Sequence, residues 1–364
     1  MEEKDKKQRA IERLSEEIKK ISEKKNNIYF FVYDTKGNPN GGLEYIYKLA
    51  KITGDIGYKT AMLYQTADKE DKFVGVGEWL GEEYASIPHY NIAKEEVDIT
   101  PSDIVFIPEL FTNVMNQTKK LPCKRVAIFQ NYDYLTEQMP FAAQWGDFGI
   151  MEAITNTKEN EEILNDIFPY VKTHVIDPYI DPMFGTSSEP KKLVVNIVSE
   201  DPSKVNKIIK PFYWKFPLFR WVSFRDLRGF PKENFAELLR DGAITIWADD
   251  NTSFGYSLIE ALKSGSIVIA KVPDTKLPWT LNENGEYTDS CIWFYNINKV
   301  HEIIANVVRA WMTDRVPEAL LNTADEYKGL YPKENTITQV TECVNGIVER
   351  RQKEMQELYN NVTK

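Results

Sequence analysis

Residues 252–260, TSFGYSLIE, combine groups that bind a phosphorylated ligand. Phe254, Gly255, Tyr256 and Ser257 follow a polar run and lead into a predicted helix that contains Glu260. The first backbone N–H groups of a helix have no partners inside it and carry partial positive charge, so they attract an anion. Glu260 lies about one turn inside the helix, where its carboxylate can accept hydrogen bonds from ligand hydroxyls. The segment therefore predicts an anion site with a hydroxyl acceptor beside it.

A β-α-β unit between Gly242 and Pro273 must position these groups. The apolar run 243–248 predicts a buried strand, Ser264-Gly265 ends the helix, and the β-branched run 266–270 predicts the next strand. In such a unit the helix begins at the carboxyl end of the sheet, where an anion can approach it. The alternative is an ordinary β-α-β segment in which Glu260 lies in solvent.

The same segment resembles the donor site of the large retaining GT-B glycosyltransferase family, of the family 4 or group 1 type. The family signature runs Glu-x-Phe-Gly, four residues, Glu-Ala, a small residue and Gly before an apolar strand. Phe254-Gly255, Glu260-Ala261 and Ser264-Gly265 match it, whereas Thr252 stands where the family has its first glutamate. The resemblance implies that Glu260 binds the nucleotide ribose. It also implies donor contacts for these five residues: Thr252, Ser253, Phe254, Gly255 and Tyr256.

A glycine pair, Gly41-Gly42, follows the first predicted strand at 28–33 and precedes a helix that contains Leu43. The family opens with the same order of strand, Gly-Gly loop and helix. The resemblance implies that the pair approaches the donor phosphates, because glycine lets the backbone come close to a ligand. The alternative is a glycine-rich turn that binds nothing.

The predicted cations of the donor site depart from the family pattern. Relatives carry an arginine and then a lysine after the first strand of the second domain, whereas Ser199 or Glu200 stands at the arginine position here and Lys204 stands near the lysine position. Arg225 and Arg228 follow a strand predicted at 219–224, so we expect them to neutralise the diphosphate instead. The alternative is that both form surface ion pairs.

The acceptor side also differs from the family, which often places a histidine at the end of a strand in the first domain. The strand predicted at 124–129 ends in Gln130, Asn131, Tyr132 and Asp133, with no histidine. Asn131 or Asp133 is therefore a candidate to contact the acceptor. A structural role in the loop is the alternative.

The resemblance implies an α/β fold of the GT-B type, in which two Rossmann-like β/α/β domains face a central cleft. The segment 175–184 matches the family's linker between the domains. We expect the following parts: an added charged amphipathic helix at 1–26, an acceptor domain at 27–184, a donor domain at 185–335, and a terminal helix at 336–364 that crosses back to the first domain. Three roles are open for the helix at 1–26: it packs on its own domain, it pairs with a second copy of the chain, or it touches a membrane surface.

Composition limits the classes of function. The 364 residues, 42% of them apolar and 27% charged, suffice for two folded domains. The three scattered cysteines favour a reducing compartment, and no apolar run is long enough to span a bilayer, so we expect a cytoplasmic protein without an integral membrane segment. The net charge of -10 disfavours unspecific attraction to nucleic acid or anionic lipid across the whole surface but leaves room for a local basic groove.

No metal or cofactor is expected apart from a nucleotide-sugar as donor substrate. Asp249 and Asp250 are adjacent and should point apart, and the family works without a bound metal. The leading hypothesis is hexosyl or pentosyl transfer, with retention at the anomeric carbon, to a glycan, lipid, protein or modified nucleic acid. Because Thr252, Ser199 and the missing histidine depart from the family, a scaffold that has lost catalysis is the alternative. A sugar-nucleotide epimerase or a phosphorylase on the same architecture is the third hypothesis.

Overall fold

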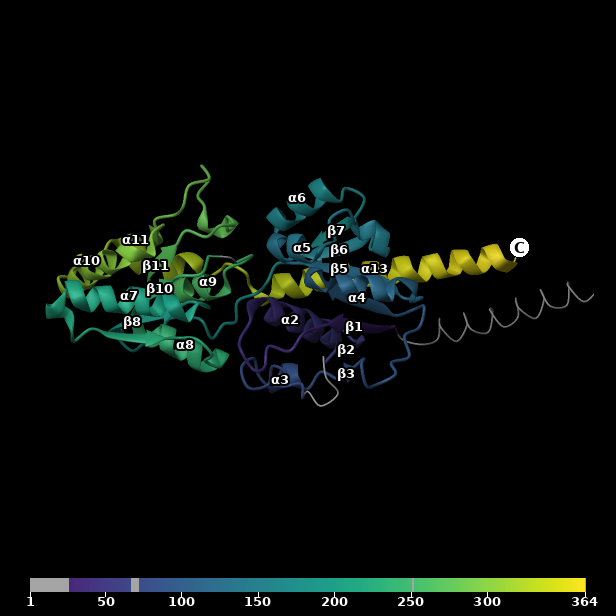
Figure 1. The fold of residues 1–364 in the computed structure, drawn as a ribbon, viewed down its shortest axis with the longest axis horizontal. Coiled ribbons are helices and arrows are strands. Elements are labelled where there is room, and N and C mark those ends of the chain that lie inside the picture. The colour runs from purple at the N-terminus through teal and green to yellow at the C-terminus, as the bar shows by residue number, and fades with distance from the viewer. Residues whose placement is uncertain (1–25, 67–71, 251, 364) are drawn as a thin grey trace, which may run out of the picture. The chain divides into compact units, whose positions relative to one another are not determined.

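The computed structural model describes residues 26–66, 72–250 and 252–363 and divides into two compact units (Figure 1). Unit 1 contains the described residues up to Pro178 together with those from Glu334 onward, and unit 2 contains Tyr179–Lys333. The helix predicted at 1–26, with the roles expected for it, lies outside the described residues except for Asn26. The predicted cleft between the domains stays a prediction.

Unit 1 is built on a seven-stranded parallel sheet in the order β3-β2-β1-β4-β5-β6-β7. Its strands are β1 Asn27–Phe31, β2 Lys59–Tyr64, β3 His89–Asn91, β4 Ile104–Pro108, β5 Lys124–Phe129, β6 Glu152–Thr155 and β7 Lys172–Val175. Its helices are α2 Gly41–Asp55, α3 Glu82–Ala85, α4 Thr112–Gln117, α5 Tyr132–Gln138, α6 Lys158–Ile167 and α13 Lys333–Thr363, with 3-10 turns at Glu109–Phe111, Thr118–Lys120 and Trp145–Phe148. The central strands are apolar and buried because helices cover both faces of a parallel sheet.

Unit 2 is a five-stranded parallel sheet in the order β12-β11-β10-β8-β9. Its strands are β8 Lys192–Val198, β9 Ser223–Asp226, β10 Gly242–Trp247, β11 Ile267–Lys271 and β12 Cys291–Phe294. Its helices are α7 Pro202–Lys215, α8 Lys232–Asp241, α9 Tyr256–Lys263, α10 Val300–Met312, α11 Glu318–Leu321 and α12 Thr323–Tyr327, with 3-10 turns η4 Pro217–Phe219, η5 Pro278–Thr280 and η6 Ile297–Lys299.

Alternating side chains of the unit 2 strands pack against two different helix pairs. Ile244 and Ile246 share one apolar cluster with Phe212 of α7 and Ile304 of α10. Trp247 belongs to the other cluster, which contains Leu239 of α8 and Leu258 of α9. Because helices cover both faces of a parallel sheet, the predicted α/β class with two Rossmann-like units is confirmed. The α9 helix consequently begins at the carboxyl edge of this sheet.

The strand predicted at 219–224 begins later than expected. Pro217–Phe219 forms the 3-10 turn η4, and β9 starts at Ser223 and extends to Asp226. The aromatic residues that suggested the earlier strand pack instead around Phe212, whose ring centroid lies 6.1 Å from that of Phe219.

Across the part of the chain that the structure describes, no helix is long and apolar enough to cross a membrane.

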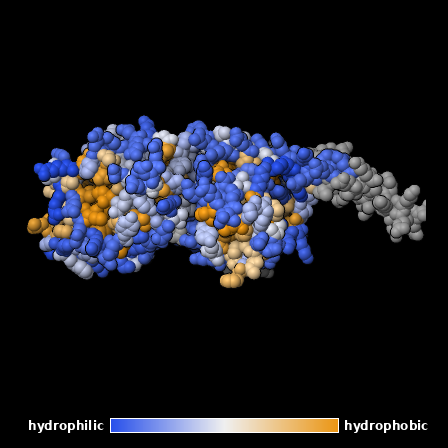
Figure 2. Space-filling view, turned by 90° about the horizontal axis from the view of Figure 1, so that it is seen from above, coloured by the Kyte–Doolittle hydropathy of each residue, from blue (hydrophilic) through white to orange (hydrophobic). Residues whose placement is uncertain are grey.

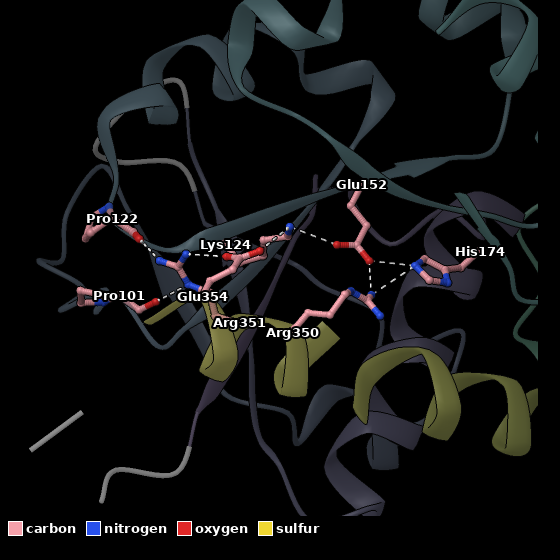
Figure 3. A network of polar contacts seen from close by, with 8 residues as sticks. All are labelled: Pro101, Pro122, Lys124, Glu152, His174, Arg350, Arg351 and Glu354. Carbon is pink, nitrogen blue, oxygen red and sulfur yellow. Dashed lines mark hydrogen bonds and ion pairs between the residues drawn. The ribbon is translucent and has the colours of Figure 1, made fainter. Parts of the chain in front are cut away.

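The α13 helix packs on unit 1 through a buried ion network at the amino edge of the sheet (Figure 3). Glu152, whose side chain is 3% exposed, pairs with Lys124 at 3.1 Å, with His174 at 2.8 Å and with Arg350 of α13. Burial alone raises the pKa of the Glu152 carboxyl, but His174, Lys124 and Arg350 together lower it to about 2. The neighbouring Arg351 donates to the carbonyl oxygen of Pro101 at 2.9 Å. The network therefore fixes α13 to the sheet electrostatically.

Replacing Glu152 with Gln should loosen α13, because it removes the buried carboxylate that joins Arg350 of α13 to Lys124 and His174 of the sheet. We expect the opening free energy of α13 to fall by about 3 kcal/mol at pH 7. The stabilisation is present above the ordinary pKa of 4.5 and is lost as the pH falls toward the folded-state value of about 2, so the difference between wild type and variant should shrink over that range. Hydrogen exchange of the α13 amides measures it.

Glu354→Gln is the matched control, since Glu354 contacts the same network through Lys124 and Arg351 but is 46% exposed. We expect its effect to stay below about 1 kcal/mol. Equal effects of the two substitutions would contradict the importance of the buried carboxylate.

Candidate functional site

The start of α9 is fixed by a glycine with left-handed backbone geometry. Gly255 has φ 76° and ψ 46°, and its N–H donates to the Thr252 hydroxyl oxygen at 3.0 Å. A Cβ at this position would lie 2.7 Å from the Leu277 Cδ1 atom. The preceding carbonyl oxygen, of Phe254, accepts the Trp279 indole N–H at 2.9 Å. This tight turn places the first amides of α9 at the carboxyl edge of the unit 2 sheet, as the glycine signature predicted.

Glu260 lies about one turn into α9 and is buried. It is 2% exposed, and its carboxylate accepts the Lys232 ammonium at 2.5 Å. The same ammonium lies over the rings of Phe184 at 5.1 Å and Tyr256 at 5.4 Å. The alternative in which Glu260 lies in solvent is therefore wrong, since the side chain is buried and its carboxylate is paired with Lys232.

Two lysines converge on one carboxylate at the end of β10. The Lys204 ammonium pairs with Asp250 and donates to the Ala248 carbonyl oxygen at 2.7 Å, and Lys271 lies 3.2 Å from the other Asp250 oxygen. Although burial raises the pKa of Asp250, hydrogen bonds from Lys204 and Lys271 lower it overall, so the carboxylate is ionised. Two ammonium groups therefore meet at one partly exposed carboxylate of the carboxyl edge.

Asp249 has different partners from its neighbour Asp250. Its carboxylate accepts the Glu200 backbone N–H at 2.8 Å, and burial together with the nearby Glu200 carboxylate raises its pKa to about 6. Within the described residues, no group of three or more His, Cys, Asp and Glu side chains is placed to hold a metal ion.

The two arginine candidates lie at opposite edges of the unit 2 sheet. Arg228 follows β9 at the carboxyl edge and pairs with Asp226, with a distance of 2.9 Å between Nε and Oδ2. Arg225 pairs at 2.7 Å with Asp241, which also contacts Lys192, the first residue of β8. Arg225 therefore points to the amino edge, away from α9. Arg225 is therefore not part of the proposed donor site, whereas Arg228 remains a candidate for it.

The carboxyl edge of unit 1 carries the Gly41-Gly42 turn at the start of α2. Asn40 caps the helix by accepting the Leu43 N–H at 2.9 Å. A Cβ on Gly42 would lie 3.5 Å from the Gln130 side-chain oxygen, and the Gln130 amide donates to the Gly42 carbonyl oxygen at 3.2 Å. Such a distance is an ordinary contact, so packing against the end of β5 does not itself require glycine at this position.

Glu109 organises the loop that holds the acceptor candidates. It follows β4, is 1% exposed, and one of its oxygens accepts the N–H groups of Gln130 at 3.1 Å and Asn131 at 2.8 Å. Burial raises the pKa of Glu109 to about 7. Asn131 in turn caps α5 by accepting the Asp133 N–H at 2.9 Å. These contacts give Asn131 a structural role in the loop, and whether it also contacts an acceptor stays a prediction.

Lys232 and Lys271 were not predicted from the sequence as site residues. Lys271 is the last residue of β11 and Lys232 is the first residue of α8, so both lie at the carboxyl edge of the sheet. Their positions next to a predicted strand end and helix start could have identified them as candidates. What the sequence did not reveal was their partners, Asp250 and Glu260, which lie on other elements.

Gly255→Ala should destabilise unit 2 more than a matched substitution does. Gly285 also has φ 76°, but a Cβ added there would meet no atom within 4 Å, so Gly285→Ala measures the backbone cost alone. We expect losses of about 2–4 kcal/mol for Gly255→Ala and about 1–2 kcal/mol for Gly285→Ala. Urea unfolding followed by tryptophan fluorescence measures both, since six of the eight tryptophans lie in unit 2. Equal losses would mean that the Leu277 contact has no importance.

Neither a protein-family model nor a curated protein matches this sequence. Solved structures do match its fold. Sucrose-phosphate synthase from Thermosynechococcus elongatus superposes with a TM-score of 0.60 at 11% identity, covering 89% of this chain and 100% of that chain. The Anabaena protein HepE, in complex with UDP-glucose, superposes with a TM-score of 0.60 at 14% identity, covering 88% of this chain and 99% of that chain.

The pneumococcal O-GlcNAc transferase GtfA, in complex with UDP and GlcNAc, superposes with a TM-score of 0.57 at 10% identity. That match covers 90% of this chain and 99% of the transferase chain. The matches extend over nearly the full length of each protein, so the likeness includes both parallel sheets. The chain therefore has the GT-B fold that its sequence predicted.

Proposed function

We propose that this protein transfers a hexosyl or pentosyl group from a nucleotide-sugar to an acceptor, with retention of the anomeric configuration. The observation that carries the proposal is the convergence of three features at one edge of unit 2: the glycine turn that starts α9, the cations Lys204 and Lys271, and the buried carboxylate of Glu260. HepE and GtfA, which share the fold, were solved with UDP-glucose and with UDP and GlcNAc.

The diphosphate of the donor is assigned to Lys204 and Lys271 at the carboxyl edge. Lys204 and Lys271 now share the Asp250 carboxylate, which is 46% exposed and therefore within reach of solvent and ligand. A diphosphate that enters here gains two charge-assisted contacts and the partial positive charge of the helix start. These groups stabilise the charge that develops on the nucleoside diphosphate when the bond to the sugar breaks. Arg228 and the Gly41-Gly42 turn are the further phosphate contacts in this proposal.

The ribose of the donor is assigned to Glu260. One of its oxygens accepts Lys232, and a carboxylate offers about four acceptor positions, so ribose hydroxyls can share it. Lys232, whose ammonium lies over the rings of Tyr256 and Phe184, holds the carboxylate in place before the ligand arrives. We assign donor contacts to Thr252, Ser253 and Phe254 in the same loop.

The remaining assignments follow the sequence analysis. We propose a cytoplasmic enzyme that works without a metal, and an acceptor contacted by Asn131 or Asp133. The acceptor is a glycan, lipid, protein or modified nucleic acid. A catalytically impaired scaffold is the second candidate, and it is favoured by Thr252, whose hydroxyl oxygen accepts the Gly255 N–H where the family carries a glutamate.

Calorimetric titration with UDP-, GDP- and ADP-sugars tests the donor site. We expect micromolar binding of one donor, and Lys204→Met or Lys271→Met should weaken it about 10- to 100-fold because each removes a charge-assisted contact. Lys192→Met is the control, since Lys192 is also paired with a carboxylate but lies at the amino edge. No binding of any nucleotide would remove the proposal.

Release of free nucleotide then separates the candidates. Transfer or slow hydrolysis of the bound donor releases a nucleoside diphosphate, whereas an impaired scaffold binds the donor and releases none. An epimerase also releases none but changes the sugar, which chromatography of the recovered donor detects.

A 2′-deoxy nucleotide tests the ribose assignment. Wild type should prefer the ribonucleotide by about tenfold or more, because the deoxy form lacks a hydroxyl that donates to the buried Glu260 carboxylate. Glu260→Gln and Lys232→Met should each reduce this preference, the second because it releases the carboxylate from its position, and Lys232→Arg should restore it. An unchanged preference in Glu260→Gln would show that the ribose binds elsewhere.

A further inference from the structure

One segment of unit 2 has a composition unlike the rest of the chain. Residues 202–225 contain six basic residues, no acidic residue and seven aromatic residues, in a protein with a net charge of -10. The segment forms α7, the turn η4 and the first residues of β9. We call its turn, residues 214–221, the α7–β9 corner.

The α7–β9 corner exposes large apolar side chains. Leu218 is 88% exposed, Trp214 is 75% exposed and Trp221 is 52% exposed, whereas Phe212, two residues before Trp214, is fully buried. Hydrophobic atoms also reach the surface of unit 2 on the face shown at the left of Figure 2. Neighbouring exposed residues of this size are rare on a soluble domain unless they meet a partner or a membrane.

Cations surround these apolar side chains. Lys215 and Arg220 are exposed within the corner, and the Arg309 guanidinium of α10 lies over the rings of Phe216 at 5.3 Å and Phe219 at 5.4 Å. One carboxylate, that of Glu302, contacts Lys215 at 2.5 Å. The corner therefore joins an apolar tip to a positive charge, opposite in sign to the protein as a whole.

The corner lies at the opposite edge of the unit 2 sheet from the start of α9. The α7 helix follows the carboxyl end of β8 and ends before the amino end of β9, which places the corner at the amino edge. A surface bound by the corner therefore leaves the carboxyl edge open for a ligand.

We propose that the α7–β9 corner docks the protein on an anionic lipid surface. Trp214, Leu218 and Trp221 enter the headgroup region, where amphipathic indole rings and apolar side chains are favoured. The cations contact the lipid phosphates, each adding to the attraction near the surface. Leu218 is the most exposed of the three apolar side chains. Nucleic-acid bases bind by stacking on aromatic rings, which leucine lacks, so this side chain favours lipid over nucleic acid.

Vesicle flotation of the full chain tests this inference independently of any nucleotide. Wild type should float with vesicles of phosphatidylcholine and phosphatidylglycerol, float much less with phosphatidylcholine alone, and lose binding at high salt. The combined variant Trp214→Ser, Leu218→Ser and Trp221→Ser should lose nearly all binding. Arg220→Gln should weaken it about fivefold.

Phe141→Ser is the matched control, because Phe141 is a fully exposed aromatic residue of unit 1 outside the corner. It should bind vesicles like wild type, and circular dichroism should show that every variant is folded. Wild type that ignores anionic vesicles, or a triple variant that binds them equally well, would overturn the proposal. So would self-association or nucleic-acid binding that depends on the corner while vesicles are ignored.

Discussion

The proposed donor site depends on the left-handed turn at Gly255. This residue has φ 76°, and a side chain here would collide with Leu277, so glycine alone lets α9 begin directly after the polar loop that ends β10. Hydrogen bonds from Gly255 to Thr252 and from Trp279 to the Phe254 carbonyl hold the turn on both sides. The α9 amides and Glu260 owe their position to this geometry, whereas Lys204 and Lys271 are placed at the same edge by α7 and β11.

The lysines of this edge are paired with carboxylates, and an anionic ligand could replace a carboxylate as their partner. Lys204 and Lys271 share Asp250, and Lys232 binds Glu260. A buried cation is costly without a partner, so the carboxylates keep the edge stable while no ligand is bound. A diphosphate offers stronger charge to Lys204 and Lys271 than one half-exposed carboxylate does. In the proposed function, a donor would therefore bind by exchanging partners with these carboxylates.

The fold was predictable from the sequence because the signals were local. Apolar strands alternate with helices, and the glycines at 41–42, 255 and 265 mark helix starts and ends that the structure contains. The charge pattern of the site was less predictable, because ion pairs join residues far apart in the chain. Arg225 illustrates this, since only the structure shows that Asp241 draws it to the amino edge. Lys232 is the opposite case, a cation overlooked because Glu260 lies on another helix.

The most direct measurement is a crystal structure of the protein grown with the nucleotide-sugar that calorimetry identifies. The account predicts diphosphate oxygens within hydrogen-bond distance of the α9 amides and of Lys204 or Lys271, and ribose hydroxyls on the Glu260 carboxylate. A nucleotide bound at another place in unit 2, or a Glu260 that contacts Lys232 and no ligand atom, would contradict it.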